Sequence, residues 1–307
     1  MSPWRQLALR AYGAATWPQR RALARTFGAE RRWPVSVLFY HRVADDRPND
    51  WTIGRRAFRR QINWLSKRFD LVSLAEAQRR LAAGDCPRPT ACITFDDGYA
   101  DNCDYAIPLL LRNRVPFTYF VSTENMIHGL PFSHDEARGE PLRPNTIEEL
   151  RAMASAGVEI GAHTRSHAHL GRSRDHDWLV EEIAGSKCDL ETRLESEVRY
   201  FAFPYGTPDT LTSAALSVAR EAGFHGACAA YGGYNLPGEC DDAFLIQRIH
   251  ADPEWARFWN WMTIDPRKLS IAAPETPPAA NDSPSELSVP PIHGPDVASM
   301  VEGGRSD

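Results

Sequence analysis

The sequence predicts an α/β protein whose parallel strands form a sheet or a barrel. Short apolar runs alternate with segments of helical periodicity from residue 35 to about residue 222, which is the order of repeated strand–helix units. Three polar motifs follow directly after three of these apolar runs. The chain has 307 residues, and one barrel-type domain of roughly 200–250 residues with a tail at each end fits that length.

A basic arm precedes the first strand. Residues 4–27 have a pattern that predicts one amphipathic helix, or two helices broken near Pro18, because proline disrupts a helix interior. Residues 1–32 carry seven arginines and one acid, Glu30. Two interpretations are open: the arm attaches to an anionic membrane surface, or it packs on the body. The packing would use Leu7, Leu9, Tyr12 and Leu23.

The body contains five predicted buried strands and six predicted helices. The strands are residues 35–40, 91–95, 117–121, 158–162 and 200–203. The helices are residues 58–68, 74–83, 106–113, 147–156, 178–194 and 211–222. Gly157 and Gly223 stand where two helices should end, a position that favours glycine.

The C-terminal segment has a different composition. Residues 272–307 hold seven of the 23 prolines, few large apolar side chains and a net charge of −5. Such a segment cannot bury enough apolar surface to offset its ordering entropy, so we predict a disordered tail over residues 269–307. The domain between arm and tail, residues 33–268, is then mildly acidic, which argues against binding of nucleic acid.

The N-terminus and the cysteines favour a cytoplasmic protein. Arg10 interrupts the apolar residues at 7–9 before a signal peptide could form its apolar region, and no run approaches the roughly 18 apolar residues of a membrane-spanning helix. The six cysteines include no CxxC pair. We expect a reduced, cytoplasmic protein, with residues 1–32 as the part that could touch a membrane.

The first polar motif contains two adjacent carboxylates. Asp96 and Asp97 follow the predicted strand at 91–95, and Gly98 permits a sharp turn. Two such carboxylates repel each other unless a cation or proton lies between them, so one could ligate a metal while the other faces a reacting water. An ordinary Asp-Asp-Gly surface turn would have the same sequence.

The second motif contains two histidines at a spacing of four. His163 and His167 would lie on one face of a helical turn. With one carboxylate they form the ligand set of a catalytic zinc site, which leaves a position for water. A solvated, histidine-rich turn is the alternative. Because the carboxyl ends of parallel strands share one face, the two motifs can converge there.

Together, the motifs TFDDGY at 94–99 and HTRSH at 163–167 resemble those of the polysaccharide deacetylases of the NodB-homology group, carbohydrate esterase family four. The resemblance covers roughly residues 35–250. It implies a distorted, incomplete (β/α) barrel with about seven strands, and a divalent metal, most commonly zinc, on Asp97, His163 and His167. It also implies that Asp96 is the general base in removing acetyl groups from N-acetylated sugars.

The third motif departs from the common family pattern. Many members have Arg-Pro-Pro-Tyr-Gly, whereas this chain has Ala202 at the arginine position, followed by Phe203, Pro204, Tyr205 and Gly206. The resemblance places substrate and oxyanion contacts at Tyr205, through its backbone N–H, and at Pro204. The missing arginine, which orients the base, has two candidate replacements in this chain: Arg248, and less favourably Arg199.

The family motif that supplies the general acid is also poorly matched by this sequence. The nearest equivalent of the family's Leu-x-His pattern is Ile249-His250, so His250 is the candidate acid, with a structural histidine as the alternative. His41 follows the first strand and either lines the site or is a buried core histidine. Two loops could shape substrate choice: the insert between Ser122 and Asn145, and residues 230–242 with Tyr231 and Tyr234.

These patterns predict a metal-dependent hydrolase acting on an acetylated amino-sugar glycan or its precursor. A catalytically impaired metal- and carbohydrate-binding protein of the same fold is the alternative, because the family arginine is absent. A third interpretation keeps the fold and exchanges the substrate for a non-sugar amide or an O-acetyl ester. The sequence gives no oligomeric state.

Overall fold

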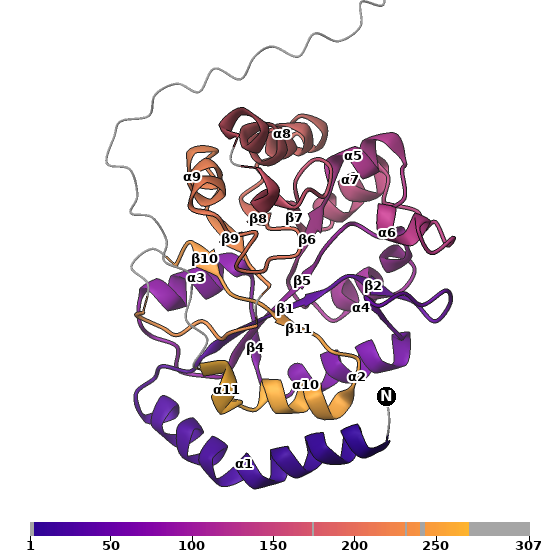
Figure 1. Ribbon diagram of the computed structural model, residues 1–307. Helices are drawn as coiled ribbons and strands as arrows, with labels where there is room; N and C mark the ends of the chain where they lie inside the picture. The colour runs from indigo at the N-terminus through magenta and orange to yellow at the C-terminus, as the bar shows by residue number, and fades with distance from the viewer. Residues whose placement is uncertain (1–2, 174, 231, 240–242, 270–307) are drawn as a thin grey trace, which may run out of the picture. The chain divides into compact units, whose positions relative to one another are not determined.

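The computed structural model describes residues 3–173, 175–230, 232–239 and 243–269. A parallel sheet of nine strands lies at its centre, in the order β10-β9-β8-β7-β6-β5-β1-β11, with β4 paired to β5 (Figure 1). The strands are β1 (Val35–Tyr40), β4 (Asp70–Leu71), β5 (Thr90–Phe95), β6 (Phe117–Val121), β7 (Glu159–Ala162), β8 (Tyr200–Ala202), β9 (Gly226–Cys228), β10 (Leu245–Ile246) and β11 (Ile249–His250). The sheet curves into a half-barrel, as the family resemblance implies, but it has nine strands where about seven were expected, because short strands such as β4 and β10 join it.

The two edges of this sheet are joined by the chain itself. β10 pairs with β9 at one edge and β11 pairs with β1 at the other, yet only Gln247 and Arg248 separate β10 from β11. Asn235 lies beside this short connection, and its Oδ1 accepts a hydrogen bond from Gln247 N at 2.8 Å. The connection therefore brings Arg248 from one edge of the sheet to the other.

Helices follow most of the strands. They are α2 (Arg55–Leu65), α3 (Leu74–Ala82), α4 (Ala106–Arg112), α5 (Thr123–His128), α6 (Ser133–Glu136), α7 (Ile147–Ser155), α8 (His176–Leu194) and α9 (Ser213–Glu221). A small pair of parallel strands, β2 (Arg42–Val43) and β3 (Thr52–Ile53), follows β1. All predicted strands and helices of the body are present, with ends shifted by up to three residues. Capping explains several starts: Thr146 and Glu149 form a capping box on α7.

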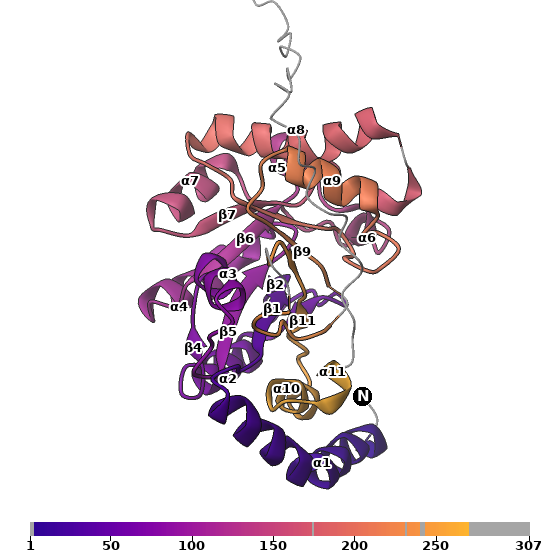
Figure 2. The ribbon, with the colours of Figure 1, turned by 90° about the vertical axis from the view of Figure 1, so that its left-hand side faces the viewer.

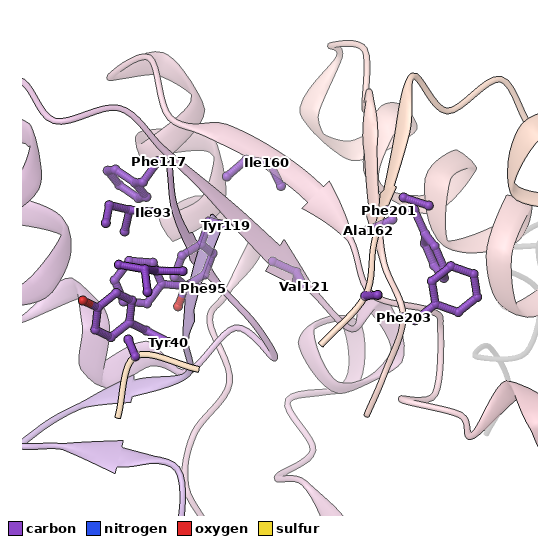
Figure 3. Close-up of a cluster of buried hydrophobic side chains, with 14 of the residues drawn as sticks. Tyr40, Ile93, Phe95, Phe117, Tyr119, Val121, Ile160, Ala162, Phe201 and Phe203 are labelled. Atoms are coloured by element: carbon purple, nitrogen blue, oxygen red, sulfur yellow. The ribbon is translucent and has the colours of Figure 1, made fainter. Parts of the chain in front are cut away.

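The strands read as continuous apolar runs because both faces of the sheet are covered. Alternate side chains form the outer core beneath the helices, including the stacked pair Tyr40–Phe95 at 5.4 Å between ring centroids (Figure 3). The residues between them, such as Val37 and Phe120, join a second cluster with α3 on the other face. Period-two alternation divides each strand between the two clusters.

The N-terminal arm is one helix, α1 (Pro3–Ala29), which continues through Pro18, so the predicted break is absent. Contacts on both sides of Pro18 hold it against the C-terminal helices α10 (Trp255–Met262) and α11 (Pro266–Leu269) (Figure 2). Tyr12 Oη donates to Asp265 Oδ1 at 2.6 Å, and the buried Arg20 donates to Asn260 O at 2.5 Å. Leu7, expected in this contact, is 57% exposed.

The predicted disordered tail falls almost wholly on residues 270–307, which lie outside the described residues; Leu269 belongs to α11. Among the described helices, none combines the length and the apolar character that crossing a bilayer requires. The five cysteines that lie in the described residues are free.

Candidate active site

Three polar motifs converge at the carboxyl ends of β5, β7 and β8. Each contains residues with a left-handed backbone: Asp97 (φ 73°), Thr164 (φ 60°), His167 (φ 56°) and Tyr205 (φ 63°). A side chain with a Cβ is strained in that region, and such strain persists only where surrounding contacts impose it. The surrounding contacts therefore fix the backbone conformation of the three motifs at the carboxyl ends of the strands.

Asp97, His163 and His167 lie together, as the sequence predicts, but residues 163–167 form an irregular turn with left-handed backbone at Thr164 and His167 in place of the expected helical turn. Asp97 Oδ1 lies 3.5 Å from His163 Nε2 and 3.2 Å from His167 Nε2, and one ligand atom from each residue lies within 4.8 Å of the others. Asp97 Oδ1 is buried, and no hydrogen-bond partner is found for it in the part of the chain that the structure describes. Among the described residues this is the only group of three such side chains that could hold a metal ion.

The histidine tautomer suits metal binding. His163 Nδ1 lies 2.7 Å from the backbone oxygen of Ala202. A carbonyl oxygen can only accept, so Nδ1 carries the proton and Nε2 keeps its lone pair toward Asp97. A carbonyl that orients a histidine in this way is the usual support of a metal ligand. Ala202 thus has a backbone role in this site, because its carbonyl oxygen orients the imidazole of His163.

The charge on Asp97 suits a cation. Burial alone would raise the pKa of Asp97, but His41, His163 and His167 outweigh that effect and lower the pKa well below its ordinary value. The carboxylate is therefore ionised at neutral pH. One carboxylate and two imidazoles fit the donor set of a catalytic divalent-metal site with a remaining position for water.

Asp96 is held by Arg248. Two nitrogens of the guanidinium donate to the two carboxylate oxygens, at 2.6 and 2.8 Å, and both side chains are buried. Arg248 also donates to Ala229 O and Thr94 Oγ1. Burial raises the pKa of Asp96, but the Arg248 charge more than compensates, so the pKa is lowered. Arg248 thus occupies the place proposed for the missing arginine.

The second arginine candidate is wrong. Arg199 precedes β8, and its Nε donates to Glu159 Oε1 at 3.2 Å at the start of β7. Both residues lie at the amino ends of their strands, whereas Asp96 follows the carboxyl end of β5. They are therefore at opposite ends of the strands from Asp96. A charge there has no contact with the carboxylate.

His41 and His250 lie beside the carboxylates and share an aromatic neighbour. His41 is buried, its Nδ1 has no hydrogen-bond partner among the described residues, and burial lowers its pKa. Burial also lowers the pKa of His250, to about 4. The ring of Trp51 lies 4.7 Å from His41 and 5.9 Å from His250 between centroids. Both histidines are neutral at pH 7.

Tyr205 covers the metal-ligand side. It follows Pro204, it is 54% exposed, and its ring lies 5.2 Å from that of His167 and 5.3 Å from that of His169. The exposed ring of Tyr205 thus forms the rim of the site beside the buried metal-ligand group. The backbone turn at Tyr205 is one of the four left-handed positions.

Trp51 and Tyr99 were given no role in the site from the sequence, whereas His134 belongs to the insert that was expected to shape substrate choice. Trp51 lies in the loop between β2 and β3, and nothing in its sequence neighbourhood indicates a role. Tyr99 Oη donates to Asp135 Oδ2 at 2.7 Å and lies 2.8 Å from His134 Nε2. The ring of His134 is 6.3 Å from that of His167. His134 and Asp135 thus bring the insert between Ser122 and Asn145, expected to shape substrate choice, close to the metal-ligand group.

The prediction for the second loop is wrong at Tyr234. This side chain is buried, its hydroxyl donates to Trp261 O and accepts from Asp265 N, and Asn235 pairs with Val35 at the start of β1. The loop thus returns to the amino ends of the strands, where Tyr234 cannot reach a substrate at Asp96. Tyr231 lies outside the described residues.

Residues 83–227 match the family described as polysaccharide deacetylase. The chain is 24% identical over 179 residues to the YxkH protein of Bacillus subtilis (strain 168), covering 58% of each protein. It is 22% identical over 166 residues to the poly-beta-1,6-N-acetyl-D-glucosamine N-deacetylase of Staphylococcus aureus (strain MRSA252), covering 51% of this chain and 54% of that protein. It therefore spans a little over half the length of these curated relatives.

Two solved structures have the same fold. IcaB from Ammonifex degensii matches with a TM-score of 0.62 and 24% identity, covering 75% of this chain and 97% of that chain. The Streptococcus pyogenes deacetylase PplD in complex with acetate matches with a TM-score of 0.63 and 19% identity, covering 76% and 99%. At these identities the likeness establishes the half-barrel architecture.

Proposed function

We propose that this protein is a metal-dependent hydrolase that removes acetyl groups from N-acetylated sugars of a polysaccharide or glycan precursor. The observation that carries the proposal is the placement of Asp96 beside the three-residue group Asp97, His163 and His167. One carboxylate is committed to Arg248, and the other points an unpartnered oxygen at two imidazoles. This division gives two adjacent carboxylates two different tasks.

The three-residue group would hold a divalent metal, and zinc suits its donors best. When bound, zinc would lower the pKa of a water molecule and polarise the acetyl carbonyl. His163 is preset for this task because its Nδ1 proton is committed to Ala202 O. Asp97 contributes the negative charge that compensates part of the ion's charge.

Asp96 would act as the general base. Arg248 fixes the plane of its carboxylate, and each oxygen keeps a further lone pair that can accept the proton of the attacking water. The low pKa of Asp96 makes it a weak base, which is sufficient only when the water is itself acidic. Arg248 would thereby take the orienting role that the sequence comparison with the family motif assigns to an arginine at the Ala202 position.

The remaining roles concern the substrate. The Tyr205 N–H, on the turn that Pro204 introduces, would donate to the oxygen that becomes negative during attack, and His41 would line the acetyl site. His250 would protonate the leaving amine. Because its pKa is about 4, His250 must first gain a proton, and Asp252 lies near enough to stabilise the resulting charge.

The glycan is proposed to be an acetylated glucosamine polymer or its precursor, which is the class that the name of the Staphylococcus aureus relative gives for that protein. The alternative, a metal- and carbohydrate-binding protein without turnover, rested on the missing arginine. The contact of Arg248 with Asp96 weakens that argument. An O-acetyl ester or a non-sugar amide would use the same groups. Residues 1–32 are proposed to contact an anionic membrane surface.

Acetate release from N-acetylglucosamine oligomers tests this function. The zinc-loaded protein should release acetate, and Asp96→Asn should lower kcat by about 10²–10⁴-fold, the usual contribution of a general base. Arg199→Met is a matched control and should keep full activity, because Arg199 lies at the amino end of β8, away from Asp96. Zinc and oligomer binding without acetate release would favour the binding protein. Faster release from O-acetylated sugars would favour the ester.

A further inference from the structure

We propose that this protein binds an anionic phospholipid of a bilayer at a second site, formed by α1, α2 and α10. This site goes beyond the basic arm as a membrane contact, since it combines a groove for a phosphate headgroup with a cavity for an acyl chain. The groove runs along α2 from Gly54 to Arg68, and the cavity at its Arg68 end lies beside the amino ends of β1 and β5, away from Asp96.

The groove is cationic without compensation. It has a volume of about 930 Å³, and its lining includes no acidic side chain. Five exposed cations lie along it: Arg56, Arg59, Arg60, Lys67 and Arg68. None of the five has a carboxylate within 4.0 Å among the described residues, although other exposed arginines, such as Arg31 and Arg79, are paired. Five unpaired cations therefore lie side by side along α2 and the turn after it, on a protein whose net charge is negative. Such a local concentration of positive charge attracts an anion.

Aromatic rings position two of these cations. The Arg60 guanidinium lies 3.7 Å from the ring centroid of Trp255, and that of Arg68 lies 4.9 Å from the ring centroid of Trp64. A guanidinium over a ring keeps its N–H groups directed outward, in a fork that matches phosphate oxygens. The phosphate of the headgroup would therefore bind N–H donors that are already oriented before it arrives.

An apolar cavity adjoins the groove. Its volume is about 420 Å³, within the usual range of ligand pockets, and four tryptophans line it: Trp17, Trp33, Trp64 and Trp259. Trp64 and Arg68 belong to both the cavity and the groove, so one amphiphilic molecule could occupy both. The lining also includes the buried Arg20, whose Nη2 is paired with Asp265 Oδ2 at 3.6 Å, so this charge is already compensated and the cavity is left to apolar groups.

The position of this cavity separates it from the active site. Pro34 and Ser36 at the start of β1 and Pro89 before β5 line it, whereas Asp96 follows the end of β5. α1, α2 and α10 lie together at this end of the described structure in both views (Figures 1 and 2). α1 also exposes Trp4, Leu7 and Trp17, side chains that insert at the headgroup level of a bilayer. Exposed apolar groups, unpaired cations and a cavity occur on one face.

Sedimentation of the full chain with vesicles tests the proposal. We expect binding to phosphatidylcholine vesicles that contain phosphatidylglycerol, no binding to pure phosphatidylcholine vesicles, and weakening by salt. The double variant Arg59→Glu, Arg68→Glu should bind at least about tenfold more weakly. Arg112→Glu, an exposed arginine at the end of α4, makes the same charge change elsewhere and should bind normally.

The chain-binding cavity has its own matched pair of variants. Ala24 lines the cavity, so Ala24→Phe should fill it and weaken vesicle binding about tenfold, while Ala22→Phe, at an exposed position of the same helix, should not. All variants should keep the wild-type melting temperature and acetate release. Equal binding to both kinds of vesicle, or binding to heparin, RNA or glycerol phosphate but not to vesicles, would overturn the proposal. So would Ala24→Phe binding as well as Ala22→Phe.

Discussion

The guanidinium of Arg248 holds both oxygens of Asp96, and both side chains are buried. A buried charge pair of this kind is costly to break, because removal of one partner leaves the other charge desolvated and unpaired. The contact also fixes the direction in which the carboxylate faces the metal-ligand group. At the scale of single residues, then, stability and the proposed chemistry depend on the same two side chains.

Substitution of Arg248 tests this dependence. Arg248→Met should lower the free energy of unfolding at pH 7 by about 3–5 kcal/mol, because Asp96 is left as an uncompensated buried charge. In the double variant Asp96→Asn, Arg248→Met the loss should be smaller than the sum of the two single losses, as denaturant unfolding would measure. Strictly additive losses would contradict a direct pair.

The pKa of His250 makes stability depend on pH. Burial lowers this pKa from 6.5 to about 4, so the unfolded chain binds more protons than the folded chain between these values. The free energy of unfolding should therefore fall as the pH is lowered from 6.5 to 4, by about 3 kcal/mol from this group, with no contribution above pH 6.5. His250→Gln should remove this component.

The control for this measurement is His176→Gln, which changes a histidine with 61% side-chain exposure. Urea unfolding of chelator-treated protein across the pH range would compare the three proteins. If wild-type and His250→Gln have parallel pH profiles, His250 is not buried as a neutral ring.

Single residues also show where sequence reasoning reaches its limit. The motifs place Asp97, His163 and His167 together because strand ends share one face, and that much follows from the sequence. The partner of Asp96 was one of two candidates, since Arg248 and Arg199 both stand near strand ends. Only the path of the chain decides between them: two residues connect β10 to β11 across the sheet edges and bring Arg248 to Asp96. Trp51 has no sequence signal at all.

At the scale of elements, the positions of the strands could be predicted from the sequence. The packing of α1 against the C-terminal helices could not. Buried strands are apolar throughout and are bounded by turns, so their positions follow from local pattern. The docking of α1 depends on polar contacts with Asn260 and Asp265, about 250 positions away, which no local pattern contains. The same limit explains Tyr234, whose loop was expected to face the substrate.

Two glycines in α1 test how that helix is docked. A Cβ on Gly13 would lie 2.5 Å from Asn260 Oδ1 and 3.1 Å from the Trp259 ring, whereas one on Gly28 would meet only ordinary contacts of 3.5 Å or more. Gly13→Ala should therefore lower the free energy of unfolding by about 1 kcal/mol, the net of overpacking and improved helix propensity. Gly28→Ala should be neutral or stabilising. Equal effects in thermal unfolding would mean that α1 does not contact α10 as described.

At the scale of the folded unit, a bound metal should couple the site to global stability. A ligand that binds only the folded chain raises the free energy of unfolding by about 2.7 kcal/mol at a hundredfold excess over its Kd. We expect zinc to raise the melting temperature of the chelator-treated wild type. His163→Ala should abolish the increase, and His176→Ala should not. An equal increase in both variants would place the metal elsewhere.

The central claim is that Asp97, His163 and His167 hold a metal on which acetate release depends. Its most direct test is titration of zinc into chelator-treated protein, with metal binding by calorimetry and acetate release from N-acetylglucosamine oligomers measured on the same samples. We predict one zinc per chain and activity that rises in proportion to occupancy. Asp97→Asn should lose both, and Asp96→Asn should keep the zinc but not the activity. Full acetate release without metal, or unchanged activity in Asp97→Asn, would contradict the account.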